Sequence, residues 1–368
     1  MPELPPVITR RRFVKGALTL GGAAALGVTS LGFPDRQAMA QSVTPQPDHR
    51  GLFGIAGHAW WLDRNPDAYL AMYRDLGVQG VRIAVDWKRF EPTEGRYDFS
   101  MYDRVLPLLN REGQEITGYF VTVPTWATSD PQLASKEQLK SDLPEAREPQ
   151  LREAIKAAVM RYPFINRWEV WNEPEMWSYL GKNPADYLRI LRAFHEESKA
   201  VNPNIQVAVA TLTGWDYLKH LYDLADSGTK PWDAVTFHPY PEGAGDGLIQ
   251  LKDVSADDPG TGERTAEIDR IHNGLISMES RNIPVWITEY GWDRPAIVQA
   301  RLLANMMKWM ATRPWIERAH LHMLHDTFDE GQYQEYGLTA LSDKGDITSK
   351  TRFIPKEPFY NAFKTASH

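Results

Sequence analysis

Two glutamates, Glu173 and Glu289, each end a short apolar run in the sequence. Glu173 ends the run at 167–173, and Glu289 ends the run at 284–289. Each run has the length and composition of a buried β-strand, with an acidic residue at its C-terminal end. A pair of carboxyl groups held on two strand ends is typical of enzymes that cleave glycosidic bonds. That chemistry requires the rest of the chain to bring the two ends together.

The sequence alternates short apolar runs with longer amphipathic ones, and these are the elements that would bring the two glutamates together. The apolar runs begin near Leu52, Gln79, Glu115, Asn166, Ile205, Ala234, Ile283 and Ala319. Helical patterns lie at 65–76, 100–112, 145–161, 184–200, 214–226, 263–281, 296–312 and 357–366. Eight such units predict an α/β protein with a single (β/α)8 TIM barrel and no appended β-domain. An open doubly wound sheet is the alternative, but the glycine-rich stretch 51–57 lacks the G-x-G-x-x-G spacing.

In a closed parallel barrel, side chains at the C-terminal strand ends converge on one mouth. Beside the two glutamates, the candidates for that mouth are His58, Arg82, Trp126, Asn172, His238, Tyr240 and Trp292. For each tryptophan, packing in the core is an equally good prediction, because large barrels bury many aromatic rings. The sequence contains no H-x-x-x-H or H-E-x-x-H pattern, so we expect no metal and no cofactor.

Several segments carry a family resemblance. The chain resembles the clan A retaining glycoside hydrolases in Val81-Arg82-Ile83, Trp171-Asn172-Glu173-Pro174, His238-x-Tyr240 and Ile287-Thr288-Glu289-Tyr290-Gly291. Segments 91–100 and 124–127 are most similar to the β-xylosidase/α-L-iduronidase family (family 39) and its exopolysaccharide-hydrolase relatives. The resemblance covers about residues 51–366. It implies that Glu173, after strand four, is the acid/base and that Glu289, after strand seven, is the nucleophile.

These roles make physical demands on the neighbours of the two glutamates. Glu289 must be ionised, and Arg82 and Tyr240 are the groups expected to hold it, because an opposite charge and hydrogen bonds favour a carboxylate. Glu173 must begin protonated, which desolvation and repulsion from Glu289 would favour. Arg82 has a second candidate partner inside the barrel, Glu169, and the two contacts are compatible.

Other polar candidates are expected to bind the sugar. Asn172 would donate to the sugar 2-hydroxyl, and His58 and His238 to other hydroxyls. Strand eight departs from the family pattern. Many clan members place a Trp or Tyr near its end, under the reactive sugar, whereas no Trp, Tyr or Phe occurs here before Phe328. The identity of that sugar therefore stays open.

Residues 1–40 have the features of an export signal. The segment 9–15 (Thr-Arg-Arg-Arg-Phe-Val-Lys) resembles the twin-arginine motif, a Gly/Ala-rich apolar run follows at 16–33, and Ala-Met-Ala at 38–40 offers a cleavage site. A membrane anchor is the alternative. We expect a linker at 41–50, a hydrolase domain at 51–368, export to the periplasm or beyond, and no membrane anchor once the signal is removed.

Composition limits the classes of molecule that the protein is expected to bind. The chain has no cysteine, which excludes disulfides and thiolate metal sites, and its formal net charge of −7 does not suggest nucleic acid. The expected partner is a polysaccharide or oligosaccharide bound by a monomer. We expect endo action, because compact single-barrel forms suit an open groove. Segments 124–147 and 240–262, after strands three and six, are the longest loops that could block one end of that groove. The alternatives are a non-catalytic carbohydrate-binding barrel in polysaccharide export, and a transglycosylase with the same intermediate.

Overall fold

The computed structural model describes residues 53–129, 142–176, 183–225, 230–240, 264–279, 282–329, 332–343 and 347–367. All of them belong to one compact unit, Arg50–His368. The predicted signal at 1–40 and linker at 41–50 lie outside the described residues. Within the described ranges, no helix combines the length and the apolarity that a bilayer crossing would need.

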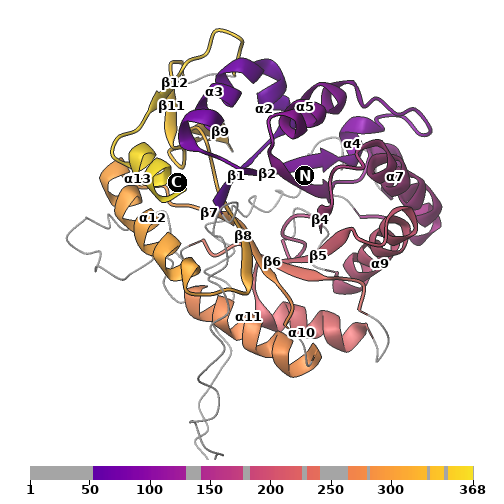
Figure 1. Ribbon diagram of the computed structural model, residues 1–368. Coiled ribbons are helices and arrows are strands. Elements are labelled where there is room, and N and C mark those ends of the chain that lie inside the picture. Colours follow the sequence, from indigo (N-terminus) through magenta and orange to yellow (C-terminus); the bar gives the residue numbers. More distant parts are fainter. Residues whose placement is uncertain are drawn as a thin grey trace, which may run out of the picture. The chain divides into compact units, whose positions relative to one another are not determined.

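The unit is a closed barrel of eight parallel strands, joined in the order β1 to β8 (Figure 1). The strands are β1 (Phe53–Gly57), β2 (Gly80–Asp86), β3 (Glu115–Val121), β4 (Arg167–Val170), β5 (Gln206–Thr211), β6 (Ala234–Phe237), β7 (Val285–Tyr290) and β8 (Ile316–Leu321). The predicted (β/α)8 barrel is confirmed.

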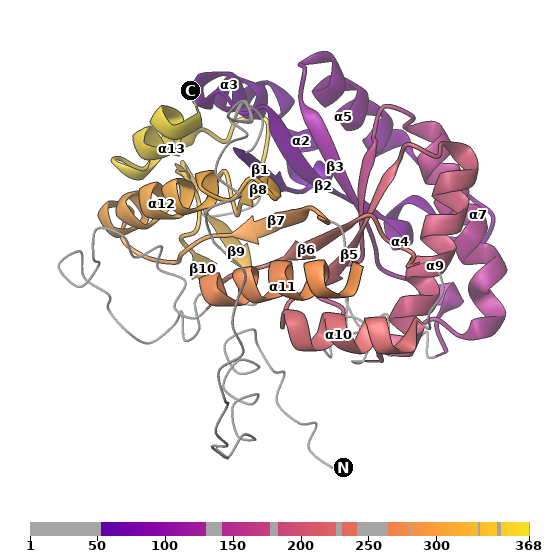
Figure 2. The same ribbon diagram turned by 60° about the horizontal axis from the view of Figure 1, so that its bottom comes forward.

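Helices surround the strands on the outside, as the turned view shows (Figure 2). They are α2 (Ala59–Arg64), α3 (Pro66–Leu76), α4 (Trp87–Phe90), α5 (Ser100–Arg111), α7 (Glu148–Arg161), α9 (Pro184–Val201), α10 (Trp215–Leu224), α11 (Arg264–Glu279), α12 (Ala296–Ala311) and α13 (Phe359–Ser367). Single-turn 3₁₀ helices, η1 (Thr125–Ala127) and η2 (Glu145–Arg147), lie between β3 and α7.

Local sequence signals explain where helix α9 starts. The Asn183 side chain accepts hydrogen bonds from the backbone N–H groups of Ala185 and Asp186, and Pro184 occupies the first turn. The apolar side of the helix then packs inward through residues such as Leu188 and Leu191, both buried. The cap and the apolar spacing together fix this helix against the strands.

Two details differ from the sequence prediction. Strand β8 begins at Ile316 rather than near Ala319, because the exposed Glu317 interrupts an otherwise buried run. Four further strands follow it and form two small antiparallel pairs: β9 (Thr327–Asp329) with β10 (Gln332–Gln334), and β11 (Thr339–Leu341) with β12 (Phe353–Pro355). These three-residue strands are too short to show an alternating pattern.

The barrel interior contains both apolar and polar side chains. Trp286 is fully buried and packs with Ala208 and Ala234. Arg82 on β2 and Glu169 on β4 form a buried ion pair, and Thr236 on β6 and Thr288 on β7 donate hydrogen bonds to Glu169. These groups form a polar layer inside the barrel.

Close approach of strands inside the barrel requires glycine at Gly54. A methyl group there would lie 2.4 Å from the Gly80 carbonyl oxygen and 2.8 Å from Cδ2 of the buried His320 ring. We expect Gly54→Ala to lower the free energy of unfolding by about 1–3 kcal/mol through overpacking. Chemical denaturation would measure this. Gly57→Ala is the control, since the nearest atom to its added methyl is the Tyr73 hydroxyl at 3.9 Å; equal losses in the two variants would contradict the prediction.

Candidate active site

Arg82 is the centre of the polar layer and contacts three acceptors with three different nitrogens. Its Nε donates to Glu169 at 2.5 Å, one terminal nitrogen donates to Glu289 at 2.7 Å, and the other donates to the Asn172 side-chain oxygen at 2.9 Å. The guanidinium carbon also lies 3.8 Å from the centre of the Tyr119 ring. Burial lowers the pKa of Arg82, but the adjacent Glu169 and Glu289 outweigh it and raise that pKa above its ordinary value. Arg82 is therefore a fixed cation.

Glu289 reaches this cation because strand β7 contains an extra residue. Ile287 pairs with Ala319 and Tyr290 pairs with Leu321, so β7 advances by three residues where β8 advances by two. Strict alternation would turn Glu289 away from the face that Thr288 occupies. The bulge lets both consecutive side chains reach the interior network, a common use of bulges beside functional sites.

Glu173 lies in an irregular segment that follows strand β4. Strand β4 ends at Val170, and not at Glu173 as the sequence pattern predicted. The chain then passes through two left-handed residues, Trp171 with φ 74° and Glu173 with φ 44°. Such conformations cost about 1–3 kcal/mol each outside glycine and cluster at functional sites. Glu173 therefore faces the mouth through a turn, not through strand alternation.

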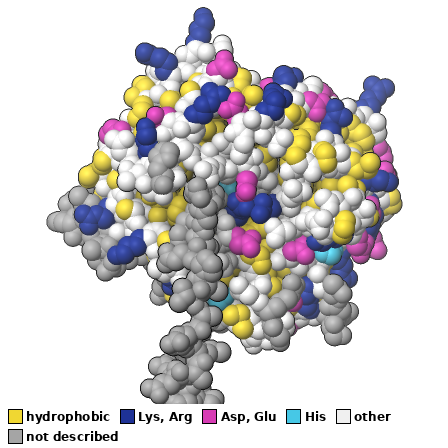
Figure 3. Space-filling model, viewed as in Figure 1, with side chains coloured by type: hydrophobic (Ala, Val, Ile, Leu, Met, Phe, Trp, Pro, Cys, Tyr) yellow, Lys and Arg dark blue, Asp and Glu magenta, His cyan; other side chains and the backbone are white. Residues whose placement is uncertain are grey.

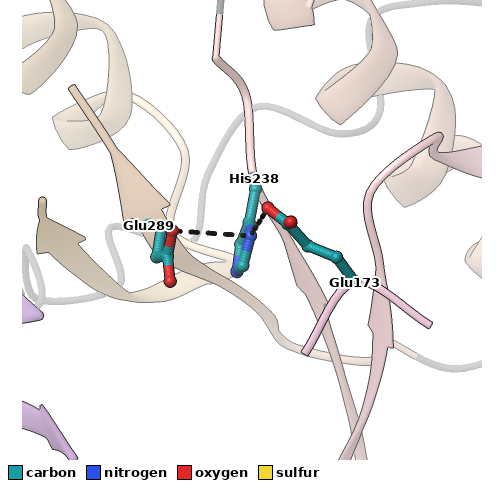
Figure 4. A group of neighbouring side chains, drawn as sticks. All are labelled: Glu173, His238 and Glu289. Carbon is teal, nitrogen blue, oxygen red and sulfur yellow. Dashed lines mark hydrogen bonds and ion pairs between the residues drawn. The ribbon is translucent and has the colours of Figure 1, made fainter. Parts of the chain in front are cut away.

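His238 stands between the two glutamates (Figure 4). Its Nδ1 lies 2.9 Å from Oε1 of Glu173 and 3.9 Å from Oε2 of Glu289. One oxygen of each carboxylate and a His238 nitrogen all lie within 4.8 Å of one another. The predicted convergence of the two strand ends is thus present, and all three side chains are buried.

These three side chains are also the set, among the described residues, that offers the geometry of a metal site. The contacts favour proton chemistry instead. Both oxygens of Glu289 already accept hydrogen bonds, from Arg82 at 2.7 Å and from the Tyr240 hydroxyl at 2.8 Å. Glu173 and His238 are directly hydrogen-bonded, and Arg82 supplies the positive charge that a metal ion would otherwise bring.

Sequence comparison places the chain beside glycoside hydrolases. A family model described as Beta-galactosidase (glycoside hydrolase family 42) matches residues 59–140. A curated relative, Beta-galactosidase BbgII of Bifidobacterium bifidum, is 28% identical over 156 residues. That match covers 35% of this chain and 22% of the relative.

Similar solved structures extend over most of the barrel. A family 39 glycoside hydrolase from Bacteroides cellulosilyticus WH2 superposes with a TM-score of 0.63 at 19% identity, covering 86% of this chain and 63% of that one. The chain has the fold of the family 39 glycoside hydrolases. A monomeric β-xylosidase from Caulobacter crescentus CB15 also superposes with a TM-score of 0.63, at 18% identity, over 86% of this chain and 68% of that one.

Within this family 39 fold, the predicted neighbours of the glutamates lie around them. Tyr240 donates to Glu289, as described above, and its ring lies edge-on to His238. Arg82 has only donors, so the oxygen of the Asn172 amide must face it. The NH₂ group of Asn172 is then left for another acceptor, such as a sugar hydroxyl.

His58 lies close to the same mouth, at the end of β1. Its Nδ1 is 3.4 Å from the Tyr119 hydroxyl, and its ring stacks on Trp60 at 4.0 Å. Burial, with a smaller contribution from nearby His322, lowers the pKa of His58 to about 3. His58 is therefore neutral at ordinary pH. Trp60 also lies under the Arg89 guanidinium, 4.6 Å from the ring centre, so its ring is occupied by protein groups.

The other two predicted tryptophans differ in placement. Trp126 is half-buried, donates to the Glu91 carbonyl oxygen at 2.9 Å, and has the Arg147 guanidinium 5.6 Å from its ring. Trp292 is only 2% exposed and packs in the hydrophobic core beside Tyr290. The prediction of a sugar contact for Trp292 was wrong, and core packing, the alternative, is what the structure shows.

Several neighbours of the site were not found from sequence. His322, after β8, lies with Nδ1 4.0 Å from Glu289 Oε2, and Tyr336 packs against both His322 and Tyr240. Glu175 is buried and anchors the turn after Glu173 through hydrogen bonds to the loop at 211–213. No motif marks these residues, because their partners lie far away in the chain.

The two long segments that could block one end of the groove, and so decide between endo and exo action, lie largely outside the described residues, at 130–141 and 241–263. On the face in Figure 3, the coloured side chains show acidic and basic groups interspersed, with no broad area of one charge. A uniformly basic surface of the kind that binds nucleic acid is not seen among the described residues of this face.

Proposed function

We propose that the protein is a retaining glycoside hydrolase that cleaves β-glycosidic bonds by double displacement. The observation that carries this proposal is the buried pair Glu173 and Glu289, whose nearest oxygens lie within 4.8 Å. Retaining enzymes hold their two carboxyl groups at roughly 5–5.5 Å, whereas inverting enzymes need roughly 6.5–9.5 Å to admit a water molecule. The separation therefore supports retention.

The two carboxyl groups have environments that suit different roles. Glu289 accepts hydrogen bonds on both oxygens, from the cation Arg82 and from Tyr240, which favours the ionised form that a nucleophile needs. Glu173 instead forms a hydrogen bond with Nδ1 of His238 at 2.9 Å, which suits a carboxyl group that exchanges its proton. In the proposed reaction Glu289 attacks the anomeric carbon while Glu173 protonates the departing oxygen. Glu173 then takes a proton from the water that releases the sugar.

The substrate proposed is a polysaccharide outside the cytoplasm, attacked within the chain. The twin-arginine pattern at 9–15 supports export to the periplasm or the medium. A bacterial exopolysaccharide, including that of the producing cell, fits this location. The similar proteins named above include a β-xylosidase and a β-galactosidase, so β-linked xylose and galactose are the first sugars to test.

The test is a screen of β-glycans and phenyl β-D-glycosides, followed by sizing of the products. Proton NMR of the first-formed product would show the β-anomer if the mechanism is retaining. The α-anomer would overturn double displacement, and binding without turnover of any β-glycan would favour the non-catalytic barrel. Oligosaccharides longer than the substrate would identify a transglycosylase.

Replacing the acid tests its assignment. We expect Glu173→Gln to lower kcat/KM for phenyl β-glycosides by roughly 10²–10⁴-fold, because the leaving phenoxide loses its proton donor. For dinitrophenyl glycosides, whose leaving group needs little protonation, the rate of the bond-cleavage step should fall far less. Steady-state and burst kinetics on the two substrates measure the difference. An equal loss for both leaving groups would assign Glu173 a role other than acid.

A further inference from the structure

We propose that Thr288 is a positioning residue that fixes the acidic proton on Glu173 by selecting the tautomer of His238. The inference rests on the proposed function, since it concerns how the acid of that reaction is kept protonated. It follows from the directions of four hydrogen bonds that join Arg82 to Glu173.

The chain of bonds starts at Glu169, which is an acceptor only. Its Oε2 receives the Arg82 Nε–H at 2.5 Å, and both groups are about 1% exposed or less. A carboxylate paired so closely with a buried guanidinium is ionised. Its other oxygen, Oε1, lies 2.7 Å from the Thr236 hydroxyl and 3.0 Å from the Thr288 hydroxyl. Both hydroxyls therefore donate to Glu169.

This direction decides what Thr288 presents to His238. The single hydroxyl proton of Thr288 points at Glu169, so its oxygen offers a lone pair to Nε2 of His238, 3.0 Å away. If Thr288 donated to His238 instead, its lone pairs would face the Glu169 carboxylate at 3.0 Å, which is repulsive. Nε2 of His238 therefore carries a proton.

A neutral imidazole has one N–H and one bare nitrogen. With the proton on Nε2, Nδ1 of His238 is bare, and it lies 2.9 Å from Oε1 of Glu173. Two acceptors at that distance would repel one another, so beside this neutral tautomer Glu173 holds the proton and donates it to Nδ1. The tautomer set by Thr288 thus favours the acid form of Glu173 over its carboxylate form.

Other charged groups face this pair and are compatible with the assignment. Glu289 lies 3.9 Å from Nδ1, and Glu169 lies 3.8 Å from Nε2 of His238. From α11, Arg264 reaches the His238 carbonyl oxygen at 3.4 Å, on the backbone side of the residue. Arg82 is occupied by Glu169, Glu289 and Asn172.

The arrangement serves both halves of the reaction. In the first half, Glu173 gives its proton to the departing oxygen, and the bond between that oxygen and the sugar breaks. Glu173 is then a carboxylate beside a bare imidazole nitrogen, which makes it a stronger base. In the second half it takes a proton from water, whose oxygen displaces Glu289 from the sugar, and the starting state is restored.

The direct test is ¹⁵N NMR of the full chain labelled at histidine, with the His238→Asn variant used to assign the His238 signals. We expect a protonated Nε2 and an unprotonated Nδ1 at neutral pH. A protonated Nδ1, in either the opposite tautomer or the imidazolium, would overturn the proposal. The measurement needs no substrate, so it can be read even if no glycoside is hydrolysed and the proposed function fails.

The second test is the pH dependence of kcat/KM on a phenyl β-glycoside. In Thr288→Val the hydroxyl is gone, His238 is free to turn its N–H toward Glu173, and the carboxylate of Glu173 gains a hydrogen bond. The alkaline limb, which reports loss of the acid form, should move to lower pH by about one unit. Thr288→Ser keeps the hydroxyl and should keep the limb at the wild-type pH. A lower rate with an unmoved limb in Thr288→Val would mean that Thr288 only supports the fold.

Discussion

The Glu289→Gln protein is expected to fold normally and to lose hydrolysis, with kcat/KM reduced by roughly 10⁴-fold or more. The amide keeps the shape of the side chain and an oxygen that can still accept from Arg82. It cannot form the glycosyl ester, because its nitrogen lone pair is delocalised and its oxygen is uncharged. Initial-rate assays on phenyl β-glycosides measure the loss of hydrolysis. Circular dichroism of the same samples shows whether the variant is folded.

Glu112→Gln is the matched control for this variant. Glu112 follows helix α5 and pairs with exposed Arg74, away from the strand ends that form the mouth. Its replacement should leave kcat/KM unchanged. Activity in Glu289→Gln comparable with that of the control would rule out Glu289 as the nucleophile and with it the double displacement.

Arg82→Met is expected to lower the free energy of unfolding by about 3–5 kcal/mol. The methionine leaves Glu169 and Glu289 buried without their cation, since these carboxylates are 0% and 7% exposed as side chains. Removing one partner of a buried pair costs far more than the pair itself contributes, because the remaining charge is desolvated and uncompensated. Urea unfolding followed by circular dichroism measures the change.

Arg104→Met is the matched control for Arg82→Met, because Arg104 forms its ion pair on the surface of the protein. Arg104 donates to both carboxylate oxygens of Asp63, but its side chain is 60% exposed. Exposed pairs contribute about 0–1 kcal/mol, so this variant should unfold almost as the parent does. Similar unfolding midpoints for the two arginine variants would mean that the carboxylates near Arg82 are better solvated than the structure indicates.

Much of the barrel could be predicted from sequence because its signals are local. A buried strand needs a run of apolar residues, and an outer helix needs an apolar stripe, so the start of seven strands was found within two residues. The ion pair of Arg82 with Glu169 could also be anticipated. Both residues occupy inward positions on strands, and a buried arginine requires an acceptor.

The parts that could not be predicted depend on departures from regular geometry. Nothing in the sequence marks Trp171 and Glu173 as left-handed, because residue preference disfavours that conformation for both. Trp292 was expected at the mouth since it follows a strand end closely, but the irregular chain after β7 directs it into the core. Tyr336 lies in a segment well beyond the eighth strand and contacts the Tyr240 ring. Sequence patterns do not predict this contact, because it depends on how distant parts of the chain fold together.

The extra residue in β7 has a consequence for how this site tolerates changes in chain length. Thr288 and Glu289 act on different partners, one through His238 and the other through Arg82, yet a single irregularity between Ile287 and Tyr290 presents both. A one-residue deletion there would remove this irregularity and would favour regular pairing of that part of the strand. It would also leave room for only one of the two side chains on the inner face. In this strand, therefore, the number of residues carries functional information that the identity of the residues alone does not.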